Sequence, residues 1–320
     1  MPRTTGDAVL LLESTDPVMR RLLETAKRAA LSDATILLTG ESGSGKDVLA
    51  HQIHRWSDRA ERPFVIVNCT GRSEHLLESE LFGHVRSALN INKPGRLEFA
   101  HGGTIFLDEI SDLTAPLQTK LLHFIKEQSF ERMGSAITIK VDTRIIAASN
   151  HDLVSEVATG RFREDLYYRL GVITLRLPAL RERRDDILPL AIRMLADAAA
   201  HDRRPPMHLS SEAASALLRY RWPGNIRELR NVVERAVLLC KNNLVTPKYL
   251  PEVLCNDLPQ PRATAVTAAS LEAIEREHIV RVMAASPSVV VAANKLGISV
   301  VTLWRRRKRY GLGLRLYRRG

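Results

Sequence analysis

The chain has 320 residues, of which 45% are hydrophobic and 26% are charged, and this balance is typical of a globular protein. It excludes collagen-like, coiled-coil and broadly disordered classes, and no apolar run is long enough to span a membrane. The three cysteines lie far apart and the first residues show no signal-peptide pattern, so we expect a cytoplasmic protein without membrane contact. Lys and Arg exceed Asp and Glu by 11, and residues 271–320 hold +8 of that excess. This asymmetry indicates a tail that binds a polyanion, although a solvated basic terminus is an equal alternative on charge alone.

The first half of the chain alternates β-rich apolar runs with segments of helical periodicity. The runs are residues 34–39, 64–68, 104–107, 144–148 and 172–177, and the helical segments include 47–56 and 116–127. Strands that alternate with helices favour an α/β fold with a mainly parallel sheet covered on both faces. We also predict a hairpin over 130–141 that turns at Gly134 and Ser135.

The second half of the chain is predicted to be helical. Helices are expected over 185–199, over 210–220 and from about 225 to 240, whereas the proline-bearing segment 255–269 has few large apolar residues and indicates a linker. The predicted organisation is therefore an α/β subdomain over 1–177, a helical subdomain over 178–254, the linker over 255–269 and a small helical domain over 270–320.

A glycine-rich loop follows the first predicted strand and leads into the helix predicted over 47–56. Its residues are Gly40, Glu41, Ser42, Gly43, Ser44, Gly45 and Lys46. Glycines let backbone amides close around phosphate oxygens, the helix N-terminus adds partial positive charge, and the lysine adds a full one. The next position, where Ser or Thr usually binds magnesium, holds Asp47. This spacing predicts a nucleotide phosphate site.

Two carboxylates end the apolar run at 104–107. At the carboxyl edge of the sheet, Asp108 can hold Mg²⁺ and Glu109 can polarise a water for attack on the γ-phosphate. Two acids after a strand can also serve as a helix N-cap, but the upstream phosphate loop favours the first interpretation.

An arginine-rich segment follows at residues 160–170. Arg163 and Arg169 could each reach the nucleotide of a neighbouring subunit and neutralise developing charge. The residues by themselves favour an ordinary surface ion-pair network with Glu164 and Asp165.

Six segments in order resemble the AAA+ domain of the bacterial enhancer-binding proteins, the sigma-54-dependent (NtrC-type) transcriptional activators. They read GESGSGKD, ELFGH, GGTIFLDEI, FREDLYYRL, LPALRERRDDI and WPGNIRELRNVVERA. The resemblance covers about residues 12–250 and implies an AAA+ P-loop ATPase that assembles into a ring, commonly a hexamer. Only about a dozen residues precede it, so we expect no receiver domain ahead of it. It also implies a bacterial protein of the cytoplasm, associated with the nucleoid.

The resemblance implies a role for each matching residue. The loop from Gly40 to Lys46 would bind the β- and γ-phosphates of ATP, and Asp47 matches the acidic residue that the family normally carries after the lysine. Asp108 and Glu109 would be the magnesium-binding and water-activating carboxylates.

Five further residues match functional positions of the family. Asn68 matches the asparagine that restrains the catalytic glutamate, and Asn150 matches the sensor of the γ-phosphate. Arg227 matches the second sensor, whereas Arg163 and Arg169 match the arginines that act across the subunit boundary.

The last fifty residues resemble the family's Fis-type helix-turn-helix domain, which binds double-stranded DNA. A first helix is expected over 271–285, a second helix and its turn together over 290–299, and the recognition helix over 301–310. The expected core residues are Ala292, Ala293, Leu296, Ile298 and Leu303, and Arg307 stands where the family often has an apolar core residue. The candidate DNA contacts are Thr302, Trp304, Arg305, Arg306, Lys308 and Arg309.

The segment 85–95 departs from the family pattern. Residues 87–92 stand where the family carries GAFTGA, the loop that touches sigma-54, and the segment is about three residues shorter than typical. One hypothesis is therefore a ring that drives sigma-54 RNA polymerase to open promoters, alone or together with a related chain. The alternative is a DNA-binding regulator that has lost sigma-54 contact and uses ATP for assembly or sensing. A third hypothesis, an AAA+ remodelling enzyme without a role in transcription, requires a tail that does not bind DNA.

Overall fold

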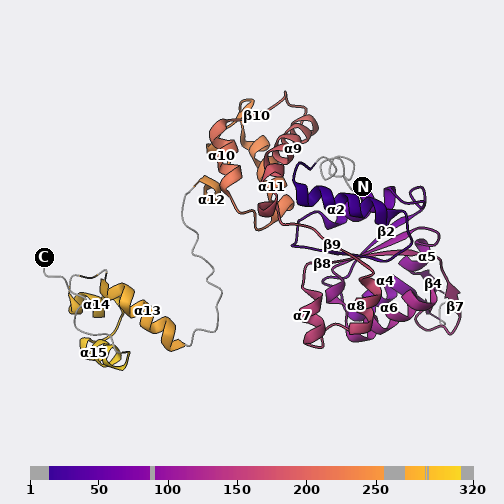
Figure 1. The fold of residues 1–320 in the computed structure, drawn as a ribbon, viewed down its shortest axis with the longest axis horizontal. Helices are drawn as coiled ribbons and strands as arrows, with labels where there is room; N and C mark the ends of the chain where they lie inside the picture. The colour runs from indigo at the N-terminus through magenta and orange to yellow at the C-terminus, as the bar shows by residue number, and fades with distance from the viewer. Residues whose placement is uncertain (1–13, 87–90, 256–270, 285, 287, 311–320) are drawn as a thin grey trace. The chain divides into compact units, whose positions relative to one another are not determined.

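The computed structural model describes residues 14–86, 91–255, 271–284, 286 and 288–310 (Figure 1). The chain divides into two compact units, Met1–Asn256 and Asp257–Gly320. Most of the predicted linker, and residues 87–90 of the segment that replaces GAFTGA, lie outside the described residues. No helix within these ranges is both long and apolar enough to cross a membrane.

A five-stranded parallel sheet forms the centre of the first unit, in the order β2-β5-β8-β1-β9. These strands are β1 (Ile36–Thr39), β2 (Phe64–Asn68), β5 (Thr104–Asp108), β8 (Arg144–Ser149) and β9 (Ile173–Arg176). The parallel sheet and all five predicted strands are confirmed. Because the strands run parallel and β5, β8 and β1 are neighbours, the carboxyl ends of β1, β5 and β8 come together at one edge. Ligands of open α/β sheets bind at such an edge.

Helices cover both faces of the sheet (Figure 1). On one face lie α2 (Pro17–Ala30) and α3 (Lys46–Arg55), and on the other lie α4 (Glu74–Phe82), α6 (Ala115–Glu127) and α8 (Glu164–Leu170). The side chains of β1 alternate between the two cores, since Ile36 and Leu38 pack with α2 and α3, whereas Leu37 packs on the opposite side. Burial on both sides explains why the strands read as continuous apolar runs in the sequence.

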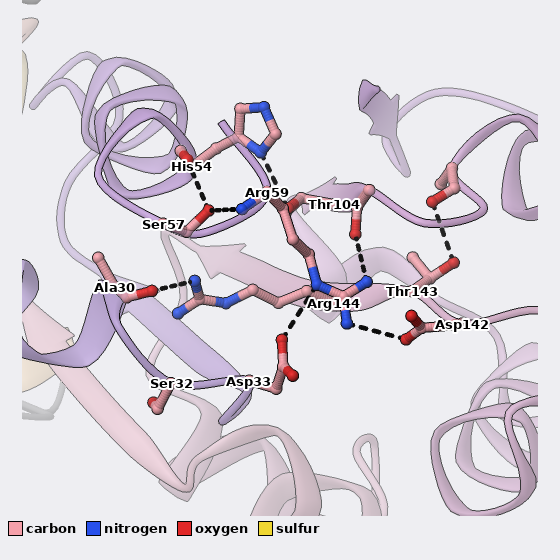
Figure 2. A network of polar contacts seen from close by, with 12 residues as sticks. Ala30, Ser32, Asp33, His54, Ser57, Arg59, Thr104, Asp142, Thr143 and Arg144 are labelled. Carbon is pink, nitrogen blue, oxygen red and sulfur yellow. Dashed lines mark hydrogen bonds and ion pairs between the residues drawn. The ribbon is translucent and has the colours of Figure 1, made fainter. Parts of the chain in front are cut away.

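Arginine side chains hold α2 against the sheet through hydrogen bonds and ion pairs, as Figure 2 shows. Arg144, the first residue of β8, is 2% exposed and donates to the carbonyl oxygens of Ala29 (2.8 Å) and Ala30 (2.7 Å). Both carbonyls lie in the last turn of α2, where helix carbonyls need partners from outside the regular helix, and the Ala29 carbonyl also accepts from Ser32. Arg59 donates to Asp33 (3.0 Å) and Asp142 (2.9 Å). The network therefore joins segments more than a hundred residues apart.

Two hairpins lie beside α4. The first pairs β3 (Gly83–Arg86) with β4 (Ile91–Pro94), and the second pairs β6 (Ser129–Glu131) with β7 (Thr138–Lys140), which confirms the predicted hairpin over 130–141. Backbone hydrogen bonds between Gly83 and Met133 and between Val85 and Met133 join the two hairpins. Short elements complete this part: α5 (Arg96–Phe99), η1 (Ile110–Asp112) and α7 (Leu153–Ala158).

The helical lid follows β9. Its helices are α9 (Ile187–His201), α10 (Ser211–Arg219), α11 (Asn225–Leu239) and α12 (Glu252–Cys255), with η2 (Leu180–Glu182), η3 (Arg184–Asp186), η4 (Pro247–Tyr249) and the paired strands β10 (His208–Leu209) and β11 (Leu244–Val245). Trp222 is 0% exposed at the centre of the lid core, and its indole N–H donates to the Leu217 carbonyl at 2.9 Å.

The second unit contains α13 (Leu271–Ala284), α14 (Val289–Lys295) and α15 (Val300–Arg309), which confirms the three helices expected there. Its core contains Ala292, Ala293 and Leu303, and Leu296 and Ile298 pack against them as predicted. Ser299 caps α15 by accepting a hydrogen bond from the Thr302 N–H at 3.1 Å.

Candidate functional site

The glycine-rich loop joins β1 to α3 at the carboxyl edge of the sheet. Gly43 (φ 74°) and Gly45 (φ 100°) adopt left-handed conformations that favour glycine, and Gly45 caps α3. The Lys46 ammonium is 5% exposed and donates to the carbonyl oxygens of Gly40 (2.9 Å) and Glu41 (3.3 Å). Burial lowers the pKa of Lys46, partly offset by the carboxylates of Glu109, Asp108 and Asp47. The loop is thus a cationic cradle at a helix N-terminus.

The carboxylates at the end of β5 face this lysine. Oε1 of Glu109 lies 3.8 Å from the Lys46 ammonium, and Oε2 accepts a hydrogen bond from the Asn150 N–H at 2.9 Å. Glu109 holds a left-handed backbone (φ 55°), an uncommon conformation for a residue with a side chain and one that concentrates at functional sites. Burial, together with the neighbouring charge of Glu109, raises the pKa of Asp108.

Asn68 lies at the same edge, because the register of β2 and β5 pairs it with Asp108. Its carboxamide oxygen accepts a hydrogen bond from the Thr70 N–H at 2.8 Å, while the Glu109 carboxylate is bound to Asn150 and Lys46. The structure therefore gathers the predicted catalytic and sensor positions at one edge, with Asn68 and Glu109 held by separate partners.

Arg163 is the N-cap of α8, Arg169 lies in its last turn, and both are exposed. Arg163 pairs with Asp165 through two contacts of 3.0 and 2.8 Å. Among the described residues, no hydrogen bond or ion pair joins Arg163 or Arg169 to the chain's own phosphate loop. Within one subunit the arrangement of Arg163 is the surface ion pair that the residues by themselves favoured.

The lid contacts the phosphate loop directly. Arg227 donates to the Ser42 hydroxyl at 2.9 Å, and the Ile226 N–H donates to the Gly43 carbonyl at 2.9 Å. Three lid residues that the sequence analysis did not select also reach the loop: Arg181, Arg183 and Asn225. Arg181 and Arg183 fall in the segment LPALRERRDDI, so membership of an ordered motif was the signal that could have found them.

The recognition helix α15 exposes Trp304, Arg305 and Lys308, and the Lys308 ammonium lies 5.6 Å from the centre of the Trp304 ring. Arg309 is also exposed, and the Thr302 hydroxyl bonds to Ser299. Arg306 differs from the other candidate DNA contacts, because its guanidinium pairs with Glu275 of α13, which also accepts from Tyr310. The ion-pair partner of Arg306 thus lies within the helix-turn-helix unit itself.

Arg307 is 6% exposed. The chain therefore buries an arginine at a position where an apolar residue was the family expectation.

Three family models match consecutive parts of the chain. Residues 12–176 match the Sigma-54 interaction domain, residues 181–267 the AAA+ ATPase lid domain, and residues 270–310 the Bacterial regulatory protein, Fis family.

Known proteins are similar over most of the chain. The alginate biosynthesis transcriptional regulatory protein AlgB of Pseudomonas syringae pv. tomato is 50% identical over 306 residues, which cover 94% of this chain and 67% of AlgB. The transcriptional regulatory protein ZraR of Escherichia coli (strain K12) is 42% identical over 291 residues, covering 90% of this chain and 66% of ZraR. The chain thus spans about two thirds of the length of these relatives.

A solved structure shares the fold. NtrX from Brucella abortus in complex with ATP superposes with a TM-score of 0.70 at 34% identity, covering 93% of this chain and 69% of NtrX. The match to a sigma-54 interaction domain does not favour the alternative of a regulator that has lost sigma-54 contact. The chain belongs to the sigma-54-dependent transcriptional regulators, with an AAA+ P-loop domain, a helical lid and a Fis-type helix-turn-helix domain.

Proposed function

We propose that this chain binds double-stranded DNA through its Fis-type domain and hydrolyses ATP in a ring of subunits, and that the hydrolysis drives sigma-54 RNA polymerase to open promoters. The observation that carries the proposal is the position of Glu109. Its carboxylate lies between the Lys46 ammonium and the Asn150 N–H, at the sheet edge where the phosphate loop leads into α3. A carboxylate so placed can orient and deprotonate a water that attacks the γ-phosphate.

The phosphate loop fits ATP, and the carboxylates fit Mg²⁺. The Ser44 hydroxyl is buried without a hydrogen-bond partner among the described residues, so it has a lone pair and a proton for a ligand. Asp108 and Asp47 supply oxygen ligands of the kind that Mg²⁺ prefers, and their charges act on Lys46. Asp108 would hold the ion, which would neutralise phosphate charge during transfer. ATP bound to the related NtrX supports the nucleotide assignment.

Arg163 and Arg169, at the two ends of α8, support the ring. Both are exposed, and the ion pair of Arg163 is a surface pair with Asp165, two residues along the chain, so a neighbour's phosphates could replace that weak pair. We propose a hexamer, in which Arg163 and Arg169 complete the site of the adjacent subunit, while Asn150 and Arg227 sense the nucleotide in their own subunit.

The exposed face of α15 supports DNA binding. We propose that Trp304 and Arg305 approach base edges in the major groove while Lys308 and Arg309 bind phosphates. Thr302 completes this set, whereas Arg306 is proposed to keep its partner Glu275. Such a protein would act in the cytoplasm at the bacterial nucleoid.

A mixing experiment tests the proposed site. Lys46→Ala disables the phosphate loop of the subunit that carries it. Arg169→Ala removes only the arginine that completes the site of the neighbouring subunit. Each variant should therefore be inactive by itself. Mixed rings should recover part of the ATPase activity, because some boundaries combine an intact loop with an intact arginine. Activity in either pure variant, or none in any mixture, would refute the shared site.

A further inference from the structure

We propose that Glu41 is a positioning residue that anchors the lid to the phosphate loop, and that this contact sets the affinity of the loop for nucleotide. The proposal rests on the nucleotide binding proposed above and assigns to Glu41 a role that its place in the loop does not require. Its side chain faces the lid, where it meets Arg181 and Asn225.

The contact is a two-point ion pair with an additional hydrogen bond. Arg181 donates to both carboxylate oxygens of Glu41, at 2.8 Å to Oε2 and in a second close contact to Oε1. The Asn225 carboxamide donates to Oε2 at 3.1 Å. The Arg181 hydrogen bonds, assisted by Asn225, lower the pKa of Glu41 to about 2 despite its partial burial. Two parallel N–H···O bonds fix orientation as well as distance.

The lid uses the same region to hold the backbone of the loop. Three consecutive carbonyl oxygens accept from it: Ser42 from Asn225 (3.0 Å), Gly43 from the Ile226 N–H (2.9 Å) and Ser44 from Arg183 (2.8 Å). All described peptide bonds are trans, so each carbonyl points opposite to the N–H that follows it. The N–H groups of Gly43 and Gly45 are therefore directed away from the lid, where they are available to phosphate oxygens.

Asn225 links the side-chain anchor to these carbonyls. It is 0% exposed, its Nδ2 donates to both Glu41 and Ser42, and its Oδ1 accepts from the Leu180 N–H at 2.8 Å. Both Asn225 (φ 51°) and the nearby Trp222 (φ 53°) hold left-handed backbones, which packing must maintain. Without the Glu41–Arg181 pair, this strained lid corner would hold the loop by fewer contacts, and the amides would lose part of their orientation.

The test is a double-mutant cycle on the full chain. Glu41→Gln keeps an acceptor for Asn225 but removes the charge, and Arg181→Met removes the guanidinium but keeps an aliphatic stem. The probe is fluorescent ADP, with its dissociation constant and release rate measured by stopped flow. We expect each single variant to raise the Kd for ADP about tenfold, mostly through faster release. The Kd of the double variant should be no higher than that of the single variant that binds ADP less tightly.

The matched control is Glu156→Gln. Glu156 of α7 makes the same kind of two-point pair with Arg161, and among the described residues no hydrogen bond or ion pair joins either residue to the phosphate loop. It should bind ADP as the wild type does. At saturating ATP the anchor variants should keep kcat within about twofold while KM rises, because Asp108 and Glu109 are unchanged. If Glu41 and Arg181 had a purely structural role, the anchor variants would show a lower unfolding midpoint, and KM would not rise separately from kcat.

Unchanged ADP affinity in both Glu41→Gln and Arg181→Met, additive losses in the double variant, or an equal loss in Glu156→Gln would overturn the anchor. A wild-type chain that does not bind the probe at all would instead refute the proposed function.

Discussion

Replacing Gly43 by alanine tests whether the lid and the phosphate loop approach as closely as the structure shows. A Cβ at position 43 would lie 2.5 Å from the Gly224 carbonyl oxygen and 3.0 Å from Cβ of Arg227. The first neighbour is backbone, so the lid itself must move by about half an ångström to reach even the shortest contact that real Cβ atoms make. The left-handed backbone at 43 (φ 74°) adds a further cost of roughly 1–2 kcal/mol for any residue with a Cβ.

Gly102 provides the matched control. It has the same φ of 74°, yet a Cβ there meets nothing within 4 Å. Gly102→Ala therefore carries the backbone cost without the collision. We expect Gly102→Ala to lose only the backbone cost in thermal unfolding, Gly43→Ala to lose more than that, and only Gly43→Ala to lose nucleotide affinity.

The expected loss follows from the hydrogen bonds at the point of collision. Moving the lid weakens the bond from Ile226 to Gly43 and the bond from Arg227 to Ser42. At about 1 kcal/mol for each hydrogen bond, the affinity for ADP should fall roughly tenfold or more. Equal ADP affinity for Gly43→Ala and Gly102→Ala would refute the close lid contact.

Four further outcomes are expected. Glu109→Gln should lower ATP hydrolysis roughly 100-fold or more while ADP still binds, and normal turnover in a phosphate-release assay would remove it as the base. Lys308→Ala should weaken binding to duplex DNA and reduce the slope of log K against log salt by about 1, whereas an unchanged slope would place Lys308 off the phosphates. Because Arg181 holds the pKa of Glu41 at about 2, below the ordinary 4.5, its ion pair is complete above 4.5 and is lost only as pH falls through about 2. The Kd ratio of Glu41→Gln to wild type should therefore stay constant between about pH 5 and pH 8, and a ratio that changes across this range would contradict the assignment. Arg144→Met should lower the free energy of unfolding by about 2 kcal/mol in urea titration, since it removes the guanidinium that donates to the Ala30 carbonyl and one of the donors to the Ala29 carbonyl, and an unchanged midpoint would contradict this role of Arg144.

Local sequence patterns predicted the sheet because its strands read as apolar runs. The run at 144–148 matches β8 to within a residue, since that strand is buried throughout and a fully buried strand reads as an unbroken apolar segment. The run at 64–68 matches β2, an edge strand with an exposed Ile66, because β-branched and aromatic residues favour strands. The helix α2 was not predicted, although Asp16 followed by Pro17 is a recognisable helix start. Its buried face includes Ala26, Ala29 and Ala30, and alanines mark a periodic apolar stripe weakly.

The candidate site also has a part that the sequence predicted and a part that it did not. The phosphate loop and the two carboxylates are local spacings, so the sequence predicted that they would meet at one edge. The lid contacts join positions far apart in the chain, as Glu41 and Arg181 are 140 residues apart and Glu41 and Asn225 are 184 apart. No local pattern reports such a pair, and only the folded lid brings it together. The partner of Arg306 was missed for the same reason, because Glu275 belongs to another helix.

Open-complex formation by sigma-54 RNA polymerase on a promoter that carries the chain's binding site tests the central claim most directly. The full chain should drive ATP-dependent promoter opening, and Glu109→Gln should abolish it while DNA binding stays normal. The strand pair β3 and β4, joined through residues 87–90, would then suffice for sigma-54 contact despite its altered sequence. Normal ATP hydrolysis and DNA binding without promoter opening, with the purified chain as the only activator, would contradict the claim.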